Sequence, residues 1–214
     1  MATHGIQAES AHPQCDYALS NVQIHQFTKP FTLVVALVSA FVLSANAGDT
    51  FKVDPVHTFV LFSVQHLGIA NTYGRFNDIS GIVVFDKDNP SKSSVELSVL
   101  VESLDTNNAI RERSLKSPDF FNVKQFPTLT FKSTKVEGSG DTLKVSGDLT
   151  IRGVTNPVTV DFKKGREGNG VFGEWRGGGE TRFTIKRSDF GMTFELGEVG
   201  DDVSIILSLE GVKK

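Results

Sequence analysis

The sequence predicts an all-β domain, and three observations support that prediction. Short segments in which apolar residues alternate with more polar ones recur about eight times, as expected for β-strands with one buried face. Hairpin-sized links rich in turn residues, such as Gly138-Ser139-Gly140-Asp141, join these segments and favour antiparallel neighbours. Only residues 106–116 show a helix-like pattern. An up-and-down barrel and a two-sheet sandwich both fit, although closure into a barrel removes exposed sheet edges.

The strand candidates lie on both sides of the helical segment. The first three are residues 58–66, 81–85 and 95–101, which alternate with a period of two. The residues on their more apolar faces are Val60, Phe62, Val64, His66, Gly81, Val83, Phe85, Val95, Leu97, Val99 and Val101. The later candidates, each again with one apolar face, are residues 129–133, 143–151, 158–162, 183–185 and 203–209. The glycine-rich stretch 165–179, which contains Trp175, is expected to be a long hairpin link.

Residues 106–116 are predicted to form the single short helix. Asn107 and Asn108 are good helix-capping residues, and Pro118 disfavours helix in the residue before it. The aromatic pair Phe120-Phe121 follows at once and favours a place beside an apolar interior. From these residues alone, the helix either closes an open end of a barrel or packs as a plain crossover.

Residues 1–47 are predicted to be an N-terminal extension that ends in a secretory signal peptide. An apolar run over residues 31–43 follows Lys29 and precedes Ala45-Asn46-Ala47, with cleavage expected after Ala47. The run is too short to span a hydrocarbon core about 30 Å thick. The mature chain would then be residues 48–214, a length typical of one domain.

The composition of residues 48–214 excludes several classes of function. The only cysteine, Cys15, precedes them, so disulfides, a thiol nucleophile and a cysteine-based metal site are unavailable in the domain. Its 21 lysines and arginines nearly balance 23 aspartates and glutamates, which leaves no electrostatic footprint for nucleic acid. Its 14 phenylalanines, beside one tyrosine and one tryptophan, supply apolar area without a polar tip that needs a partner.

Neither a metal site nor a catalytic centre is predicted. Zinc or iron would need His57 and His66 together with a carboxylate, but their odd spacing places them on opposite faces of a regular strand. His57 is expected in a turn after Asp54-Pro55, and His66 at the polar end of the inward face. No G-x-S-x-G nucleophile motif occurs. A lipid-acting enzyme or metal-dependent factor using both histidines and the acidic loop near Asp201 is the competing hypothesis.

Arginines in the domain are scattered and form no basic run. We expect most of them to be exposed or paired with neighbouring acids such as Glu112 and Asp189, while one or two at a barrel mouth would meet the polar head of a ligand. They are Arg75, Arg111, Arg113, Arg152 and Arg187.

Eight short motifs occur in order along residues 48–214. They are Asp54-Pro55-x-His57, Phe62-Ser63-Val64-Gln65-His66-Leu67, Tyr73-Gly74-Arg75-Phe76, Ser103-Leu104-Asp105-Thr106-Asn107, Leu115-Lys116-Ser117-Pro118-Asp119-Phe120-Phe121, Phe126-Pro127-Thr128-Leu129-Thr130-Phe131, Gly147-Asp148-Leu149-Thr150-Ile151-x-Gly153-Val154-Thr155 and Arg187-Ser188-Asp189-Phe190-Gly191. Together they resemble the YceI-like proteins. Two positions depart from that family's pattern. Ser114 stands where many members carry histidine, and Gly177-Gly178-Gly179-Glu180 replaces an Arg-Ala-Gly-Phe-like sequence. Ser114 argues against a histidine at the mouth of the barrel at this position. The glycine run makes the start of the strand around it hard to place.

The resemblance implies a lipocalin-like, eight-stranded antiparallel up-and-down β-barrel with the helix of residues 106–116 as a cap near one end. It implies secretion to the periplasm and a bound polyisoprenoid, isoprenoid quinone or fatty-acid derivative, with no catalytic residue and no catalytic cofactor. Burial alone can hold such a ligand, because each buried methylene contributes about 0.8 kcal/mol.

The residues expected to face the ligand lie on the inward faces of the strands, with two more near the mouth. They are Val60, Phe62, Val64, His66, Phe76, Val83, Phe85, Leu97, Val99, Phe131, Leu149 and Phe183 on the strands, and Phe120 and Phe121 near the mouth. Nucleic acid is excluded as a partner by the charge balance. Transient membrane contact for ligand exchange and association into a homodimer are left open. So is a solid-cored stress or adhesion module without a ligand.

Overall fold

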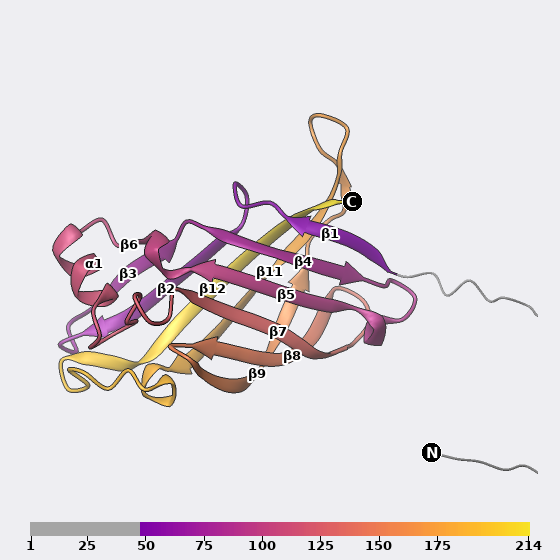
Figure 1. Cartoon of the computed structure of the whole chain (residues 1–214). Helices are drawn as coiled ribbons and strands as arrows, with labels where there is room; N and C mark the ends of the chain where they lie inside the picture. Colours follow the sequence, from indigo (N-terminus) through magenta and orange to yellow (C-terminus); the bar gives the residue numbers. More distant parts are fainter. Residues whose placement is uncertain (1–47) are drawn as a thin grey trace, which may run out of the picture. The chain divides into compact units, whose positions relative to one another are not determined.

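The computed structural model describes residues 48–214, which form an antiparallel barrel with one α-helix (Figure 1). The strands are β1 (Asp49–Val53), β2 (Phe59–His66), β3 (Ala70–Phe76), β4 (Ile79–Phe85), β5 (Ser94–Leu100), β6 (Leu104–Asp105), β7 (Thr128–Glu137), β8 (Thr142–Ile151), β9 (Val154–Lys164), β10 (Gly168–Asn169), β11 (Trp175–Lys186) and β12 (Val199–Lys213). The helix is α1 (Ala109–Lys116), and 3-10 turns occur at η1 (Pro90–Lys92), η2 (Val101–Ser103) and η3 (Arg187–Phe190). The predicted signal peptide lies outside the described residues and stays a prediction.

The barrel closes because the long strand β12 pairs on both sides. Around the ring the order is β11, β9, β8, β7, β5, β4, β1 and β12, and β12 pairs back with β11. The end of β12 pairs with β1 and its first part with β2, so β1 and β2 are two halves of one barrel strand. Likewise β3 pairs with β2 while β4 pairs with β1. The result is a closed eight-stranded antiparallel barrel, which confirms the predicted fold and excludes the sandwich.

The glycine run at residues 177–179 belongs to β11 and not to a link, which corrects the expected boundary. Strand β11 begins at Trp175. A Cβ atom on Gly178 would collide with the carbonyl oxygen of Leu209 on β12, and one on Gly179 with the carbonyl oxygen of Lys163 on β9. Glycine therefore allows the close approach of neighbouring backbones at this point of closure.

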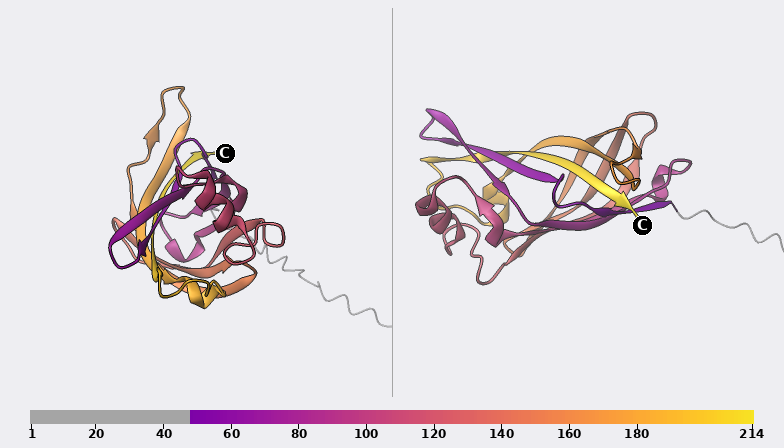
Figure 2. Two further views of the ribbon diagram at one scale, coloured as in Figure 1. Left: turned by 90° about the vertical axis from the view of Figure 1, so that its left-hand side faces the viewer. Right: turned by 90° about the horizontal axis from the view of Figure 1, so that it is seen from above.

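The single helix is where the sequence predicts it, although it begins later, at Ala109. Asn108 provides the N-cap, since its side-chain oxygen accepts a hydrogen bond from the Arg111 backbone N–H at 2.9 Å. Glu112 reaches back to the backbone N–H of Thr106 at 2.8 Å, which holds the preceding segment outside the helix. The helix and the loop after it lie across one end of the barrel (Figure 2), here called the helix end.

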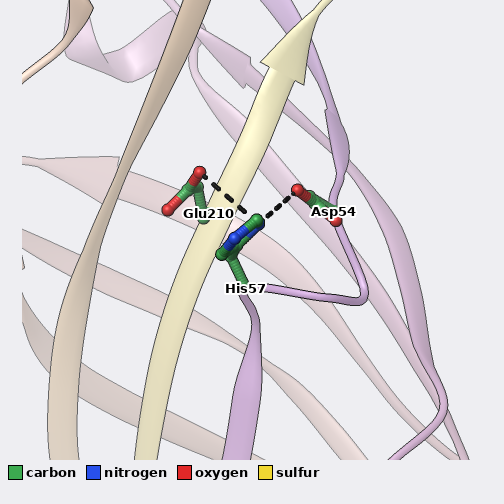
Figure 3. A group of neighbouring side chains, drawn as sticks. All are labelled: Asp54, His57 and Glu210. Atoms are coloured by element: carbon green, nitrogen blue, oxygen red, sulfur yellow. Dashed lines mark hydrogen bonds and ion pairs between the residues drawn. The ribbon is translucent and has the colours of Figure 1, made fainter. Parts of the chain in front are cut away.

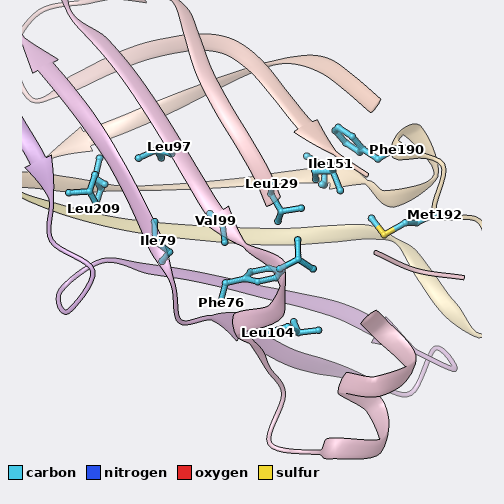
Figure 4. Packing of buried hydrophobic residues seen from close by; sticks show 13 residues of the cluster. Phe76, Ile79, Leu97, Val99, Leu104, Leu129, Ile151, Phe190, Met192 and Leu209 are labelled. Carbon is cyan, nitrogen blue, oxygen red and sulfur yellow. The ribbon is translucent and has the colours of Figure 1, made fainter. Parts of the chain in front are cut away.

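The helix end is packed with fully buried side chains. Val101 is completely buried, and Leu104, Phe190 and Met192 are at most 5 % exposed. Figure 4 shows Leu104 beside Phe76, and Phe190 and Met192 beside Ile151. Val101, Leu104, Phe190 and Met192 come from η2, the short strand β6, η3 and the loop after it, so the connections between the long barrel strands supply much of the packing at this end. None of the described helices is long and apolar enough to cross a membrane.

A buried arginine ties these connections together. Arg187 is 3 % exposed, and its guanidinium donates to four backbone carbonyls at 2.8 to 3.0 Å, those of Met192, Phe194, Val199 and Gly200. Burial lowers the pKa of Arg187 from its usual value, while the nearby Asp201 and Glu195 oppose that shift. Arg187 therefore differs from what is expected of most arginines in the domain, which is exposure or pairing with a neighbouring acid. Its partners are two carbonyls of the loop that covers the helix end and two at the start of β12.

We expect Arg187→Met to lower the free energy of unfolding by about 3 kcal/mol or more, because four carbonyls lose charged donors inside the protein. The matched control is Arg182→Met on β11, whose side chain is 67 % exposed and pairs with Glu180. That control should change stability by at most about 0.5 kcal/mol. Urea denaturation of both variants makes the comparison, and similar values for the two would show that the carbonyl contacts are not structurally important.

Candidate functional site: an apolar cavity with one polar end

The barrel encloses a cavity of about 550 Å³. Because successive side chains of a strand alternate between faces, every barrel strand sends one set of residues inward. Val83 from β4, Leu97 from β5, Phe131 from β7, Val145 from β8 and Leu207 from β12 are examples, and all are hydrocarbon side chains. The volume falls within the range of about 300 to 1,000 Å³ that is usual for small-molecule sites.

Of the residues predicted to face a ligand, all but His66 line this cavity. Those that line it are Val60, Phe62, Val64, Phe76, Val83, Phe85, Leu97, Val99, Phe120, Phe121, Phe131, Leu149 and Phe183. His66 is exposed at the last position of β2, beside the loop between β2 and β3. The alternation gives its face correctly, but at the rim of the barrel that face meets solvent. Ligand contact by the lining residues stays a prediction.

Most of the lining that the prediction left out comes from the later strands. These residues share the apolar face of segments that the sequence already identifies as strands, so the period-two pattern contained the signal. They include Leu143, Val145 and Ile151 on β8, Val158, Val160 and Phe162 on β9, Ile185 on β11, and Val203, Ile205, Leu207 and Leu209 on β12. The cavity wall therefore surrounds the lumen on all sides.

Phe120 and Phe121 lie at the closed helix end and not at the mouth, which corrects their predicted place. Phe120 is 6 % exposed, and its ring meets the edge of Phe194 at a centroid distance of 5.6 Å. Phe121 makes a similar edge contact with Phe76 at 5.7 Å. Arg187 lies over the Phe120 ring. The aromatic pair thus forms the floor of the cavity.

The opposite end of the cavity is polar and exposed, and we call it the mouth. Its residues are Lys87 after β4, Asp141 before β8, Lys164 at the end of β9, and Glu167 and Trp175 beside β10. Lys87 pairs with Glu167 at 3.2 Å, and the Trp175 indole N–H donates to the same carboxylate at 3.2 Å. Lys164 lies over the Phe85 ring at 5.3 Å. Charged groups that border hydrocarbon in this way suit a ligand with a polar head and an apolar tail.

Next to the mouth, outside the cavity, a charged network joins β1, β2, β11 and β12. His57 Nδ1 lies 2.7 Å from Asp54 Oδ2 in the turn before β2, which is the place predicted for it (Figure 3). Arg176 Nη1 donates to Asp54 Oδ2 and to Glu210 Oε1, both at 2.6 Å. Burial raises the pKa of Asp54, but the hydrogen bonds from His57 and Arg176 more than offset this and hold the pKa at about 2.

This network does not offer a good metal site. Asp54, His57 and Glu210 are close enough together to ligate one ion. However, the Arg176 guanidinium already bonds both carboxylates, so a metal cation would have to displace or repel a fixed positive charge. His57 and His66 flank the two ends of β2, which separates them by the length of that strand. His57 and His66 therefore cannot ligate the same ion, which removes the main support for the metal-dependent hypothesis.

The fold and the cavity define a class, that of closed antiparallel β-barrels with an enclosed apolar cavity. A family model described as the YceI-like domain matches residues 51–211. A UPF0312 protein of Pseudomonas paraeruginosa is 41% identical over 183 residues, which cover 84% of this chain and 96% of that protein. The chain belongs to the YceI-like family.

Solved structures share the same fold. BcnA of Burkholderia cenocepacia superposes with a TM-score of 0.66 at 26% identity, over 74% of this chain and 98% of that one. A polyisoprenoid-binding domain from Saccharophagus degradans gives a TM-score of 0.64 over 77% of this chain and 98% of that one. At 15% identity the second likeness shows the fold alone.

The lowered pKa of Asp54 predicts an acid-dependent loss of stability. A depressed carboxyl pKa stabilises the folded state above the unfolded value of 3.8, and that contribution disappears as the pH falls from about 4 to about 2. We expect Asp54→Asn to remove this part of the pH dependence, roughly 1 to 2 kcal/mol after allowance for solvent screening. The control Asp148→Asn, at an exposed position of β8, should retain it. Urea unfolding across this pH range measures both; identical pH profiles for the two variants would contradict the assignment.

Proposed function

We propose that the protein binds and carries, or sequesters, a long apolar molecule inside the barrel and is not an enzyme. The observation that carries this proposal is the lining of the 550 Å³ cavity, which is predominantly hydrocarbon from the Phe120 floor to the mouth. Burial of ten to fifteen methylenes would contribute roughly 8 to 12 kcal/mol before association costs are subtracted. No specific polar contact is needed for tight binding.

The chemical class of the ligand follows from the shape of the site. A narrow lumen that is closed at the helix end accepts an extended chain and leaves any polar head at the mouth beside Lys87 and Glu167. Polyisoprenoids, isoprenoid quinones and fatty-acid derivatives all have this form. The shared fold of the polyisoprenoid-binding domain of Saccharophagus degradans supports a ligand of this kind.

Binding is favoured over catalysis by where the reactive groups lie. The ionisable side chains of the cavity lining are concentrated at its two ends. The Thr181 hydroxyl, which also belongs to the lining, donates to the Asp161 carbonyl at 2.8 Å and has no neighbouring base in the lining to activate it. Both histidines of the described residues lie outside that lining. The open volume also argues against a solid-cored module.

We further propose that the protein acts in the periplasm, on the basis of the signal peptide predicted in residues 1–47.

The test is to block the lumen and compare bound lipid. Val160 lies on the inward face of β9 opposite Val145, whereas its neighbour Thr159 is exposed on the outer face. We expect wild type and Thr159→Trp, purified from the native cell envelope, to retain an apolar ligand of one defined mass in native mass spectrometry. Val160→Trp should lose it or retain a shorter chain.

Overpacking makes Val160→Trp less stable by about 1 to 3 kcal/mol, so the comparison is made under conditions in which both variants are folded. Repeated absence of any lipid from wild type and from Thr159→Trp would count against the proposed function. Equal retention by both variants would place the ligand outside the lumen.

A further inference from the structure

The hairpin between β10 and β11 presents two adjacent apolar side chains to solvent. Val171 and Phe172 are each 93 % exposed, the highest exposures among the large hydrophobic residues of the described chain. They occupy the centre of a turn in which the Gly173 N–H donates to the Gly170 carbonyl at 3.2 Å. Glycine, asparagine, aspartate and serine are usual at such positions, and no local geometry requires a hydrophobic residue there. The folded barrel gains nothing from these two side chains.

The turn is nevertheless well held. The Gly170 N–H donates to the Glu174 carbonyl at 2.7 Å, and the Phe172 N–H donates to the Glu174 carboxylate at 3.0 Å. The same carboxylate accepts from Arg176 Nε at 2.6 Å, which connects the tip to the network around Asp54. The apolar pair is therefore displayed on an ordered turn, so little conformational entropy would be lost on binding.

A second cavity at the base of this hairpin has more basic than acidic side chains in its lining, the acidic ones being Glu180 and Glu210. Its volume is about 490 Å³, and Lys163, Arg166 and Arg176 all contribute to it. Arg176 is engaged with carboxylates, but Lys163 and Arg166 form no ion pair with any carboxylate of the described chain. Glu180 lies opposite Lys163 in the β9–β11 register, but it accepts a hydrogen bond from Arg182. Lys163 and Arg166, beside an exposed apolar tip, are therefore available to an anionic lipid surface, with its acyl chains below its phosphates.

The hairpin also lies next to the mouth of the barrel. Glu167 and Trp175, which flank it in sequence, both line the main cavity. In Figure 1 the hairpin is the orange loop that projects beyond the barrel wall near the C-terminus. A surface that bound the tip would thus lie close to the opening through which a ligand passes.

We propose that the β10–β11 hairpin docks the barrel on anionic phospholipid bilayers. Val171 and Phe172 insert among the acyl chains, and Lys163 and Arg166 contact lipid phosphates. A bilayer is favoured over a second protein surface because two side chains on a narrow turn cannot bury the roughly 1,200 Å² or more that a stable protein interface needs. The proposal deepens the proposed function, since the membrane is the natural reservoir of the apolar ligand, but the docking itself does not depend on that ligand.

Intrinsic tryptophan fluorescence can report vesicle binding. Trp175 is the only tryptophan, it is 39 % exposed, and it lies at the foot of the hairpin. We expect vesicles of phosphatidylcholine mixed with phosphatidylglycerol to shift its emission to the blue, and Val171→Ser/Phe172→Ser to weaken vesicle affinity roughly tenfold or more. The matched control is Ile69→Ser/Ile110→Ser, which removes two exposed isoleucines, 82 % and 77 % exposed, from the helix end.

The control should bind vesicles within about twofold of wild type. No binding by wild type, or equal binding by the Val171/Phe172 variant, overturns the proposal. Loss of binding only in the Ile69/Ile110 variant would assign docking to the helix end instead, which also overturns it.

A second comparison tests the cations. Lys163→Glu/Arg166→Glu should abolish the preference for vesicles that contain phosphatidylglycerol over those of phosphatidylcholine alone. Lys132→Glu/Lys135→Glu changes two exposed lysines on β7 by the same total charge and should leave that preference intact. An equal effect of both variants would show that net charge and not this site is responsible, and would contradict the phosphate contacts.

Native mass spectrometry separates this proposal from the proposed function. The Val171/Phe172 variant has an unaltered lumen, so it should retain any ligand that wild type carries. A barrel that docks on vesicles but never carries a lipid would refute the proposed function alone. A lipid-loaded wild-type barrel that ignores vesicles would refute the docking alone.

Discussion

The hydrogen bonds of the buried Arg187 guanidinium determine which end of this barrel is closed and which is open. An eight-stranded barrel is open at both ends unless connections cover them. Here one charged group donates to two carbonyls of the covering loop and to two at the start of β12, which holds the loop against the barrel. The loop brings Phe194 against Phe120, and the aromatic pair becomes a floor. With that end sealed, the cavity can open only at the polar mouth around Lys87 and Lys164. A charge buried in the connections thus makes a through-channel into a blind pocket.

The polar and apolar parts of the structure are kept separate. Strand alternation fills the lumen with hydrocarbon, while the ion pairs and hydrogen-bonded networks lie in turns, on the outer face and at the two ends. A single unpaired polar group in the lumen would cost free energy against an apolar ligand. Arg176 and Asp54 show the converse arrangement, because they join four strands at the barrel wall without entering the main cavity. The lumen can therefore bind by burial, and the network can stabilise closure independently.

Most of the longer strands could be predicted because alternation is local, and each strand shows its inward face without knowledge of its neighbours. Strands β1 and β3 have no counterpart among the predicted strands, because β1 is short and β3 is mostly polar. The position of a residue along the barrel axis depends on the neighbouring strands and cannot be read from local alternation. The face of His66 is therefore predicted correctly, but its exposure at the rim is not. Arg187 gave no signal because its partners are backbone carbonyls of residues 192–200, whose identity carries no information about hydrogen bonding. The predicted position of Phe120 near the mouth is wrong for a related reason. An aromatic pair after a helix indicates an apolar interior but does not say which end of a barrel is sealed.

A barrel with one opening must release its ligand by the path through which it entered, so exchange is controlled at the mouth. The contacts there are weak by nature. The Lys87–Glu167 pair is partly exposed, with Lys87 more than half exposed, and exposed ion pairs of this kind contribute about 0 to 1 kcal/mol. The floor, in contrast, rests on buried aromatic contacts and charged hydrogen bonds that are costly to break. The rim can therefore rearrange to admit a chain while the floor stays fixed, and this asymmetry favours one-ended loading from whatever surface lies against the β10–β11 hairpin.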